Sequence, residues 1–141
     1  KVTEIGVTKI IPINTEFSDR KIVRADRLKK ISQEASEQSN SINIPVVKEV
    51  TEMNDLLKNW DKERLICFCD EKGGKPILEI DRILKKFKKI AIFIGPVGGW
   101  SEADRKPFQS LQIFRANLGD NILKADTAAV YSLSCLKELL R

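Results

Sequence analysis

Short runs of consecutive apolar residues alternate along this chain with segments in which apolar residues recur every three or four positions. A continuous apolar run is typical of a strand covered on both faces of a sheet, and the wider spacing is typical of a helix with one buried face. The strongest runs, at 65–69 and 90–94, predict two buried strands. Shorter runs at 9–13 and 112–118 predict two more strands, with Pro12 at an edge or a strand end because proline lacks the N–H that a sheet needs. The run at 44–47 predicts a short extended segment.

Helices are expected between these strands. Three of them span 26–38, 78–87 and 126–140. A fourth is capped by Thr51 and reaches Trp60, and a short fifth begins at Ser101. Ser101 and Asp104 have the spacing of a reciprocal N-terminal cap, and Pro107 is expected to shorten or kink that helix. The polar segment 70–76 predicts a loop. Strands that alternate with helices predict an α/β fold with a parallel sheet between helical layers.

Composition narrows the chemistry open to the chain. Its 141 residues suit one domain, which we expect to span 1–141. The net charge of +5 fits an anionic partner such as RNA, but many proteins carry such a charge for solubility alone. The sequence has no histidine, so the chain supplies no Ser-His-Asp triad, no histidine-bound metal and no imidazole base. We expect no metal site.

The same composition indicates a compartment. No apolar run approaches the roughly 20 residues that cross a bilayer, so we expect no membrane partner. The three cysteines do not form a disulfide framework, and their odd number together with many lysines predicts a reducing, cytoplasmic environment.

Two glycine-containing segments follow expected strands. The first, 94–101, reads Ile-Gly-Pro-Val-Gly-Gly-Trp-Ser, and the second, 118–129, reads Leu-Gly-Asp-Asn-Ile-Leu-Lys-Ala-Asp-Thr-Ala-Ala. Ligands of open α/β sheets gather outside the carboxyl ends of strands, where glycines let the backbone approach them. Each segment also fits a plain structural interpretation, the first as a tight turn and the second as a turn before a helix whose N-cap is Asp126 or Thr127.

Four motifs in order resemble those of one enzyme family. Residues 1–7 read Lys-Val-Thr-Glu-Ile-Gly-Val, residues 34–39 read Glu-Ala-Ser-Glu-Gln-Ser with Pro45 beyond them, and the two glycine segments follow. This set resembles the ribosomal small subunit methyltransferase E family of the SPOUT superfamily, which methylates N3 of a uridine in 16S ribosomal RNA. The resemblance extends over essentially the whole chain.

The resemblance implies an α/β domain with a C-terminal trefoil knot, acting as a homodimer on 16S ribosomal RNA or the small ribosomal subunit. S-adenosylmethionine would be the cofactor, held in the knot largely by backbone groups. The cofactor-binding residues that it implies are Ile94, Gly95, Gly98, Gly99, Leu118, Gly119, Ile122, Leu123 and Thr127. The strand end near Phe68 and Cys69 is a further candidate. By this resemblance we expect the family's N-terminal RNA-binding barrel and first strand to be absent from the given sequence, which suggests that a segment upstream of Lys1 has been lost.

Charged positions of the two loops depart from the family pattern. Val97 replaces a glutamate, Asn121 and Lys124 replace two arginines, and Asp126 replaces another glutamate. Lysine lacks the bidentate fork of arginine, and valine cannot hydrogen-bond through its side chain. Two interpretations therefore stay open: an active uridine methyltransferase, or a catalytically impaired knotted dimer that acts as an RNA-binding or structural module. Asn121, Lys124 and Asp126 are the candidates for positions near the reacting groups.

Other features favour structural roles. A phosphate or nucleotide site is disfavoured because neither loop has a P-loop Lys-Ser/Thr pair. Cys67 and Cys69 are two apart on a strand, so we expect them to pack on one face rather than bind metal. Trp100 is expected to fill the core rather than stack on a base. The lysines of 85–89 fit a solvated helix end as well as an RNA contact, and the apolar stripe of 126–140 fits core or dimer interface.

Overall fold

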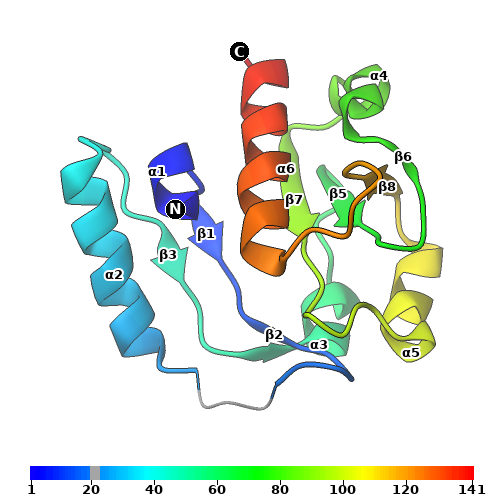
Figure 1. Cartoon of the computed structure of the whole chain (residues 1–141), viewed down its shortest axis with the longest axis horizontal. Coiled ribbons are helices and arrows are strands. Elements are labelled where there is room, and N and C mark those ends of the chain that lie inside the picture. Colours follow the sequence, from blue (N-terminus) through cyan, green and yellow to red (C-terminus); the bar gives the residue numbers. More distant parts are fainter. Residues whose placement is uncertain (20–22) are drawn as a thin grey trace.

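The computed structural model describes residues 1–19 and 23–141. Figure 1 shows the order of the elements along the chain. They are α1 (Val2–Ile5), β1 (Lys9–Ile10), β2 (Ile13–Asn14), α2 (Ala25–Gln38), β3 (Val46–Val47), β4 (Thr51–Glu52), α3 (Met53–Lys58), β5 (Arg64–Cys69), β6 (Lys75–Pro76), the 3₁₀ helix η1 (Ile77–Ile80), α4 (Asp81–Leu84), β7 (Lys89–Phe93), α5 (Glu102–Arg105), the 3₁₀ helix η2 (Lys106–Ser110), β8 (Ile113–Asn117) and α6 (Ala125–Leu139).

All strand pairs in the described part of the chain are parallel. The largest sheet has the order β6-β8-β5-β7, and two short pairs, β1 with β3 and β2 with β4, lie beside it. In the large sheet β5 pairs with β7 on one side and with β8 on the other. The next strand in the chain, β6, pairs with β8 and not with β5. The carboxyl ends of β5, β7 and β8 meet at one edge.

Strand β5 is buried on both faces, as its continuous apolar run predicts. Leu65, Cys67 and Cys69 belong to one core cluster, and Ile66 and Phe68 belong to the other. Side chains alternate between the faces of a strand, so the period of two separates the two clusters. The prediction that Cys67 and Cys69 pack on the same face is confirmed.

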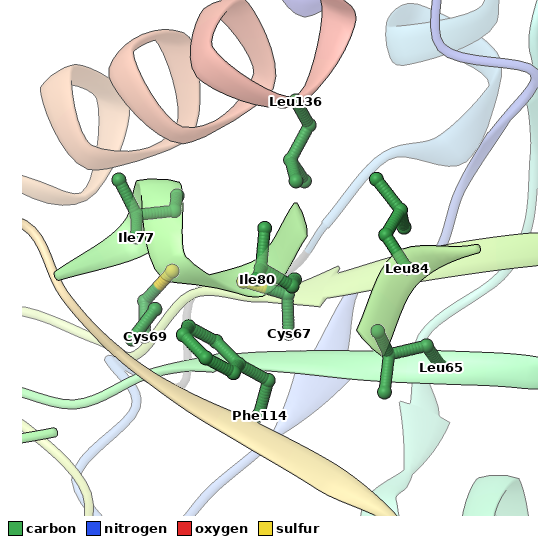
Figure 2. Packing of buried hydrophobic residues seen from close by; sticks show 9 residues of the cluster. Leu65, Cys67, Cys69, Ile77, Ile80, Leu84, Phe114 and Leu136 are labelled. Atoms are coloured by element: carbon green, nitrogen blue, oxygen red, sulfur yellow. The ribbon is translucent and has the colours of Figure 1, made fainter. Parts of the chain in front are cut away.

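One face of the sheet is covered by α6, η1 and α4. Figure 2 shows Leu136 of α6 above the strands, with Ile77 and Ile80 of η1 and Leu84 of α4 in the same cluster. All four side chains are buried. The apolar stripe of α6 thus contributes Leu136 to the core, whereas Leu140 remains 60% exposed.

The other face is covered by α3 and η2 and is rich in aromatic rings. Phe68 of β5 stacks on Trp100 at a centroid distance of 4.8 Å, and Phe108 of η2 contacts Phe68, Phe93 and Trp100. Met53 and Leu57 of α3 complete this cluster. A parallel sheet between helical layers is therefore confirmed, and the trefoil knot stays a prediction.

Three expected elements differ from the structure. The strand 9–13 is split at Pro12, which has no N–H, and its two halves pair with different partners, β3 and β4. The expected cap at Thr51 is wrong: Thr51 lies in β4, its hydroxyl donates to the carbonyl of Glu49, and α3 begins at Met53. The helix 78–87 is replaced by η1 and α4, because the three-residue period of η1 places both Ile77 and Ile80 in the core.

Two short elements were not expected at all. Strand β6 lies inside the predicted loop 70–76, beside β8. Gly74 permits this approach, because its φ is +129° and a Cβ there would lie 2.7 Å from the carbonyl oxygen of Arg115. Helix α1 packs against α6 and α2. The other expected helices are found, and Ser101 and Asp104 form the reciprocal cap before the short α5. Among the described residues no helix is long and apolar enough to cross a membrane.

The core contact of α6 gives the first prediction. Leu136→Ala should lower the free energy of unfolding by about 3 kcal/mol, because Leu136 is 2% exposed and its loss leaves a cavity between α6 and the sheet. Leu140→Ala, on the same helix but 60% exposed, should change it by less than about 0.5 kcal/mol. Urea unfolding followed by circular dichroism measures both; equal losses would contradict the packing described.

Candidate functional site

The two glycine loops leave the same edge of the sheet. Loop 94–101 follows β7, loop 118–124 follows β8, and β5 lies between these strands with Phe68 opposite Phe93 and Cys69 opposite Ala116. Neighbouring strands are about 4.8 Å apart, so the loops start roughly 10 Å from each other, on either side of the end of β5. Tertiary structure thus brings together two segments that are far apart in the sequence.

Loop 94–101 is packed tightly on its inner side and open on its outer side. A Cβ on Gly95 would lie 3.0 Å from Nε1 of Trp100, and one on Gly98 would lie 2.8 Å from Cβ of Phe17. Gly99 closes a turn with Pro96 at φ +75°. Val97 at the tip is 98% exposed. A side chain at Gly98 or Gly99 would therefore force its neighbour to shift, one at Gly95 would crowd the indole of Trp100, and the tip of the loop faces solvent.

Trp100 anchors this loop in the core. Its indole is 1% exposed, stacks on Phe68, and donates from Nε1 to the carbonyl of Cys69 at 2.8 Å. The prediction that Trp100 fills the core is confirmed. Because its hydrogen-bond partner is the last residue of β5, Trp100 ties the loop to the central strand.

Loop 118–124 presents backbone and apolar groups. Gly119 has φ +120°, its N–H donates to Oδ1 of Asn117 at 2.7 Å, and Ile122 is 84% exposed. Within the described part of the chain, the N–H groups of Asn121, Ile122 and Leu123 have no hydrogen-bond acceptor in the protein. Free donors beside an exposed apolar side chain form a surface that suits a ligand with both polar and apolar parts.

The N-cap expected at Asp126 or Thr127 is wrong. Helix α6 begins at Ala125, and Lys124 occupies the N-cap position without a side-chain bond to the helix. Asp126 instead accepts a hydrogen bond from Nζ of Lys1 at 3.2 Å. This bond lowers the pKa of the Asp126 carboxyl below its usual value, with further help from the backbone of Thr127.

The residues that we expect to bind the cofactor differ in how much of their surface is exposed to solvent. Ile94, Gly95, Gly99, Leu118 and Leu123 are half-buried beside the core, whereas Gly98, Gly119, Ile122 and Thr127 are exposed. The candidates Asn121, Lys124 and Asp126 are also exposed. Phe68 and Cys69 are buried in opposite core clusters, so their side chains belong to the core and only the end of their strand borders the loops.

Sequence reasoning did not identify a cluster of four charged side chains that meet at the end of β5: Asp70, Glu71, Arg105 and Arg115. The buried carboxylate of Asp70 accepts from Nη1 of Arg105, and from Nε and Nη2 of Arg115 at 3.1 and 2.7 Å. The neighbouring Glu71 accepts from Nη2 of Arg105 at 2.8 Å. The signal that could have found them is an acidic pair directly after the most apolar strand, where parallel strands end.

The pKa of Asp70 reflects these bonds. Burial raises the pKa of its carboxyl, but hydrogen bonds from Arg105, from the N–H of Lys72 and from Arg115 outweigh burial and bring the pKa below its ordinary value of 3.8. Asp70 is therefore ionised at neutral pH and holds two elements, α5 and β8, at the end of β5.

Comparison with known proteins identifies the family. A family model described as "RNA methyltransferase domain" matches residues 1–137. The chain belongs to this family. It is 33% identical to the ribosomal RNA small subunit methyltransferase E of Rickettsia conorii over 97% of the chain and 56% of that relative. It is 30% identical to the protein of the same name from Bacillus subtilis, over the whole chain and 60% of that relative.

A solved structure agrees with this assignment. The ribosomal RNA small subunit methyltransferase E of Neisseria gonorrhoeae, bound to S-adenosyl methionine, matches the RNA methyltransferase domain with a TM-score of 0.83 and 26% identity. The match covers 98% of this chain and 57% of that one. The chain thus spans little more than half the length of the relatives that it resembles.

Other groups considered from the sequence lie away from the two loops. Lys88 and Lys89 sit before and at the start of β7, at the opposite edge of the sheet, and pair with Glu63 and Asp61 at 3.0 and 2.9 Å. These exposed ion pairs favour the solvated interpretation of the lysine cluster over an RNA contact. A hollow of about 730 Å³ lies near the end of the first loop, where Ala103 and Asp104 of α5 face Thr15 and Ser18. In residues 1–19 and 23–141 no cluster of three metal-ligating side chains occurs.

Asp70 gives a prediction with a defined pH dependence. Because its folded-state pKa lies below 3.8, the ionised carboxylate stabilises the RNA methyltransferase domain above pH 3.8, and this contribution disappears as pH falls through the folded-state pKa. Asp70→Asn should lower the free energy of unfolding at pH 7 by roughly 3 kcal/mol, because it leaves Arg105 and Arg115 without a buried charged partner.

Unfolding of both proteins at pH 7 and at pH 2 measures this effect, and the difference between them should shrink at the lower pH. Asp126→Asn is the matched control, since its ion pair with Lys1 is exposed and contributes little. A constant difference across this pH range would show that Asp70 is not stabilising as an anion.

Proposed function

We propose that this RNA methyltransferase domain binds S-adenosylmethionine between loops 94–101 and 118–124 and transfers its methyl group to N3 of a uridine in 16S ribosomal RNA. The observation that carries the proposal is that the two loops follow the strands on either side of β5 and leave the sheet at the same edge. The family match and the S-adenosyl methionine in the relative from Neisseria gonorrhoeae support this choice of ligand.

The residues present fit the proposed cofactor. Its adenine and methionine parts need apolar contact and backbone hydrogen bonds, and loop 118–124 offers exposed Ile122 with the free N–H groups of Asn121 and Leu123. The open positive-φ backbone at Gly119 has no atom within 4 Å of a Cβ placed there, so this side of the loop has room for a ligand. Ile94, Gly95, Leu118 and Leu123 would line the inner side.

The bound cofactor supplies an electrophilic methyl group and its own leaving group. The chain then has to align the uridine, exclude water and accept or hold the N3 proton. Asn121, Lys124 and Asp126 are the side chains on the second loop and first turn of α6 that we propose near the reacting nitrogen. The pKa of Asp126 is lowered by Lys1, so its carboxylate is ionised at neutral pH and can act only as an acceptor.

We also propose that the protein acts as a homodimer in the cytoplasm. Tyr131 of α6 leaves 44% of its surface exposed. An exposed aromatic side chain on a helix that already packs on the core suits a contact with a second copy.

A second candidate function is a catalytically impaired dimer that binds RNA or serves a structural role. The observation that favours it is that Val97, 98% exposed at the tip of the first loop, and exposed Asn121 stand where the family has charged residues. Neither side chain contributes to the core, so their identity does not affect the fold. Both functions therefore fit the same structure.

Cofactor binding tests the proposed site directly. Calorimetric titration with S-adenosylmethionine should show saturable binding, and ATP and NAD should show none. Ile122→Ala should raise the Kd roughly tenfold by removing apolar contact with the ligand, and should leave stability unchanged because Ile122 is 84% exposed.

Leu78→Ala is the control, since Leu78 is also exposed but lies on η1. An unchanged Kd for Ile122→Ala would show that the ligand does not contact this loop. Binding of ATP in preference would contradict the choice of cofactor.

Methyl transfer separates the two candidate functions. The intact protein, incubated with labelled S-adenosylmethionine and small-subunit RNA that lacks the modification, should produce 3-methyluridine, detected by mass spectrometry of the nucleosides. Catalysis that depends on backbone groups and on the cofactor should tolerate Val97 and Asn121, the residues that this chain has in place of charged ones.

A dimer that binds cofactor without producing 3-methyluridine would favour the impaired module instead. In that case the double substitution Val97→Glu with Asn121→Arg should recover methylation. In an enzyme that is already active, the same double substitution should change the rate little.

A further inference from the structure

The acidic pair after β5 connects the first glycine loop and strand β8 to the central strand. Asp70 follows Cys69, the last residue of β5, and its N–H donates to the carbonyl of Ala116 in β8 at 3.1 Å. Glu71 lies next to it and faces the first loop. Because β5 separates β7 from β8, this pair lies between the two loops that we propose as the cofactor site.

Glu71 contacts the backbone of loop 94–101. Its Oε1 accepts from the N–H of Trp100 at 3.3 Å, and a Cβ on Gly99 would lie only 2.7 Å from the same oxygen. Gly99, at φ +75°, is thus the residue that allows the carboxylate to approach. The carboxylate therefore contacts the turn at its last two residues, Gly99 and Trp100.

Arg105 fixes the position of both carboxylates. Its Nη1 donates to Asp70 and its Nη2 donates to Glu71 at 2.8 Å, and its side chain is only 15% exposed. Arg105 comes from α5, the helix that directly follows the loop. The loop is therefore held at its start by β7 and at its end by Arg105, with Glu71 between them.

The charges of this cluster balance. Asp70 and Glu71 face Arg105 and Arg115, and the side chain of Asp70 is fully buried, while that of Glu71 is 26% exposed. Asp70 is shared by two arginines, so it holds the protein core. Glu71 alone joins an arginine to the loop backbone, so its loss should affect the loop more than the fold.

We propose that Glu71 is a positioning residue, which holds loop 94–101 in the conformation that binds S-adenosylmethionine. This inference rests on the proposed function for the identity of the ligand. The carboxylate need not touch the ligand, because it acts through the N–H of Trp100 and the turn at Gly99. If its loss leaves about a tenth of the molecules with the loop in place, the apparent Kd rises about tenfold.

The test compares Glu71→Ala and Glu71→Gln with Glu102→Ala in the 141-residue chain. Glu102 is the control because it lies on α5 beside the same loop but forms only an exposed ion pair with Lys72 at 3.4 Å. Amide hydrogen exchange is measured over 95–101, and the Kd for S-adenosylmethionine is measured by calorimetry well below each melting temperature.

Glu71→Ala should lose roughly tenfold or more in exchange protection over 95–101, with β5 and β8 unchanged, and roughly tenfold in affinity. Glu71→Gln keeps an oxygen acceptor for Trp100 and should restore most of both. Glu102→Ala should match the unmodified chain.

Protection over 95–101 that stays unchanged in Glu71→Ala would overturn the inference, as would a lowered melting temperature with an unchanged Kd. Failure of the unmodified chain to bind S-adenosylmethionine would count against the proposed function. Hydrogen exchange would still decide whether Glu71 holds the loop.

Discussion

The burial of β5 on both faces is the constraint on which the rest of the structure depends. A strand with Leu65, Cys67 and Cys69 on one side and Ile66 and Phe68 on the other must be covered by two helical layers and flanked by two strands. Strands β7 and β8 take these flanking places. Because all three run in parallel, their carboxyl ends share one edge, and the loops that follow them are brought together as a consequence of packing.

The buried core meets the proposed cofactor site at the end of β5. Asp70 is a buried anion, which is costly unless it is fully paired, and Arg105 and Arg115 supply the pairing. The same arginine that neutralises Asp70 reaches Glu71 and thereby the first glycine loop. The aromatic cluster also ties the first glycine loop to β5, because Trp100 stacks on Phe68 and donates a hydrogen bond to Cys69. Stability and the shape of the loop therefore depend on the same few contacts.

Membership of the RNA methyltransferase domain family fits this division between a rigid inner side and an open outer side. Positions on the inner side of the loops are glycine or apolar, and their identity follows from packing distances such as the 3.0 Å between a Cβ on Gly95 and the indole of Trp100. The four loop positions that we expected to depart from the family pattern, Val97, Asn121, Lys124 and Asp126, are all exposed. The fold thus leaves the exposed residues free to vary, and whether they alter turnover is a question of chemistry rather than of stability.

The sequence by itself predicted the long buried strands, the two long helices, the capping box at Ser101 and both glycine loops, because these depend on local spacing and on continuous apolar runs. It did not predict η1 in place of a regular helix, the split of β1 from β2 at Pro12, or β6, because these depend on which partner each segment meets. The charged cluster of Asp70, Glu71, Arg105 and Arg115 was missed for the same reason. Its members are up to 45 residues apart, and only the order of strands in the sheet brings them into contact.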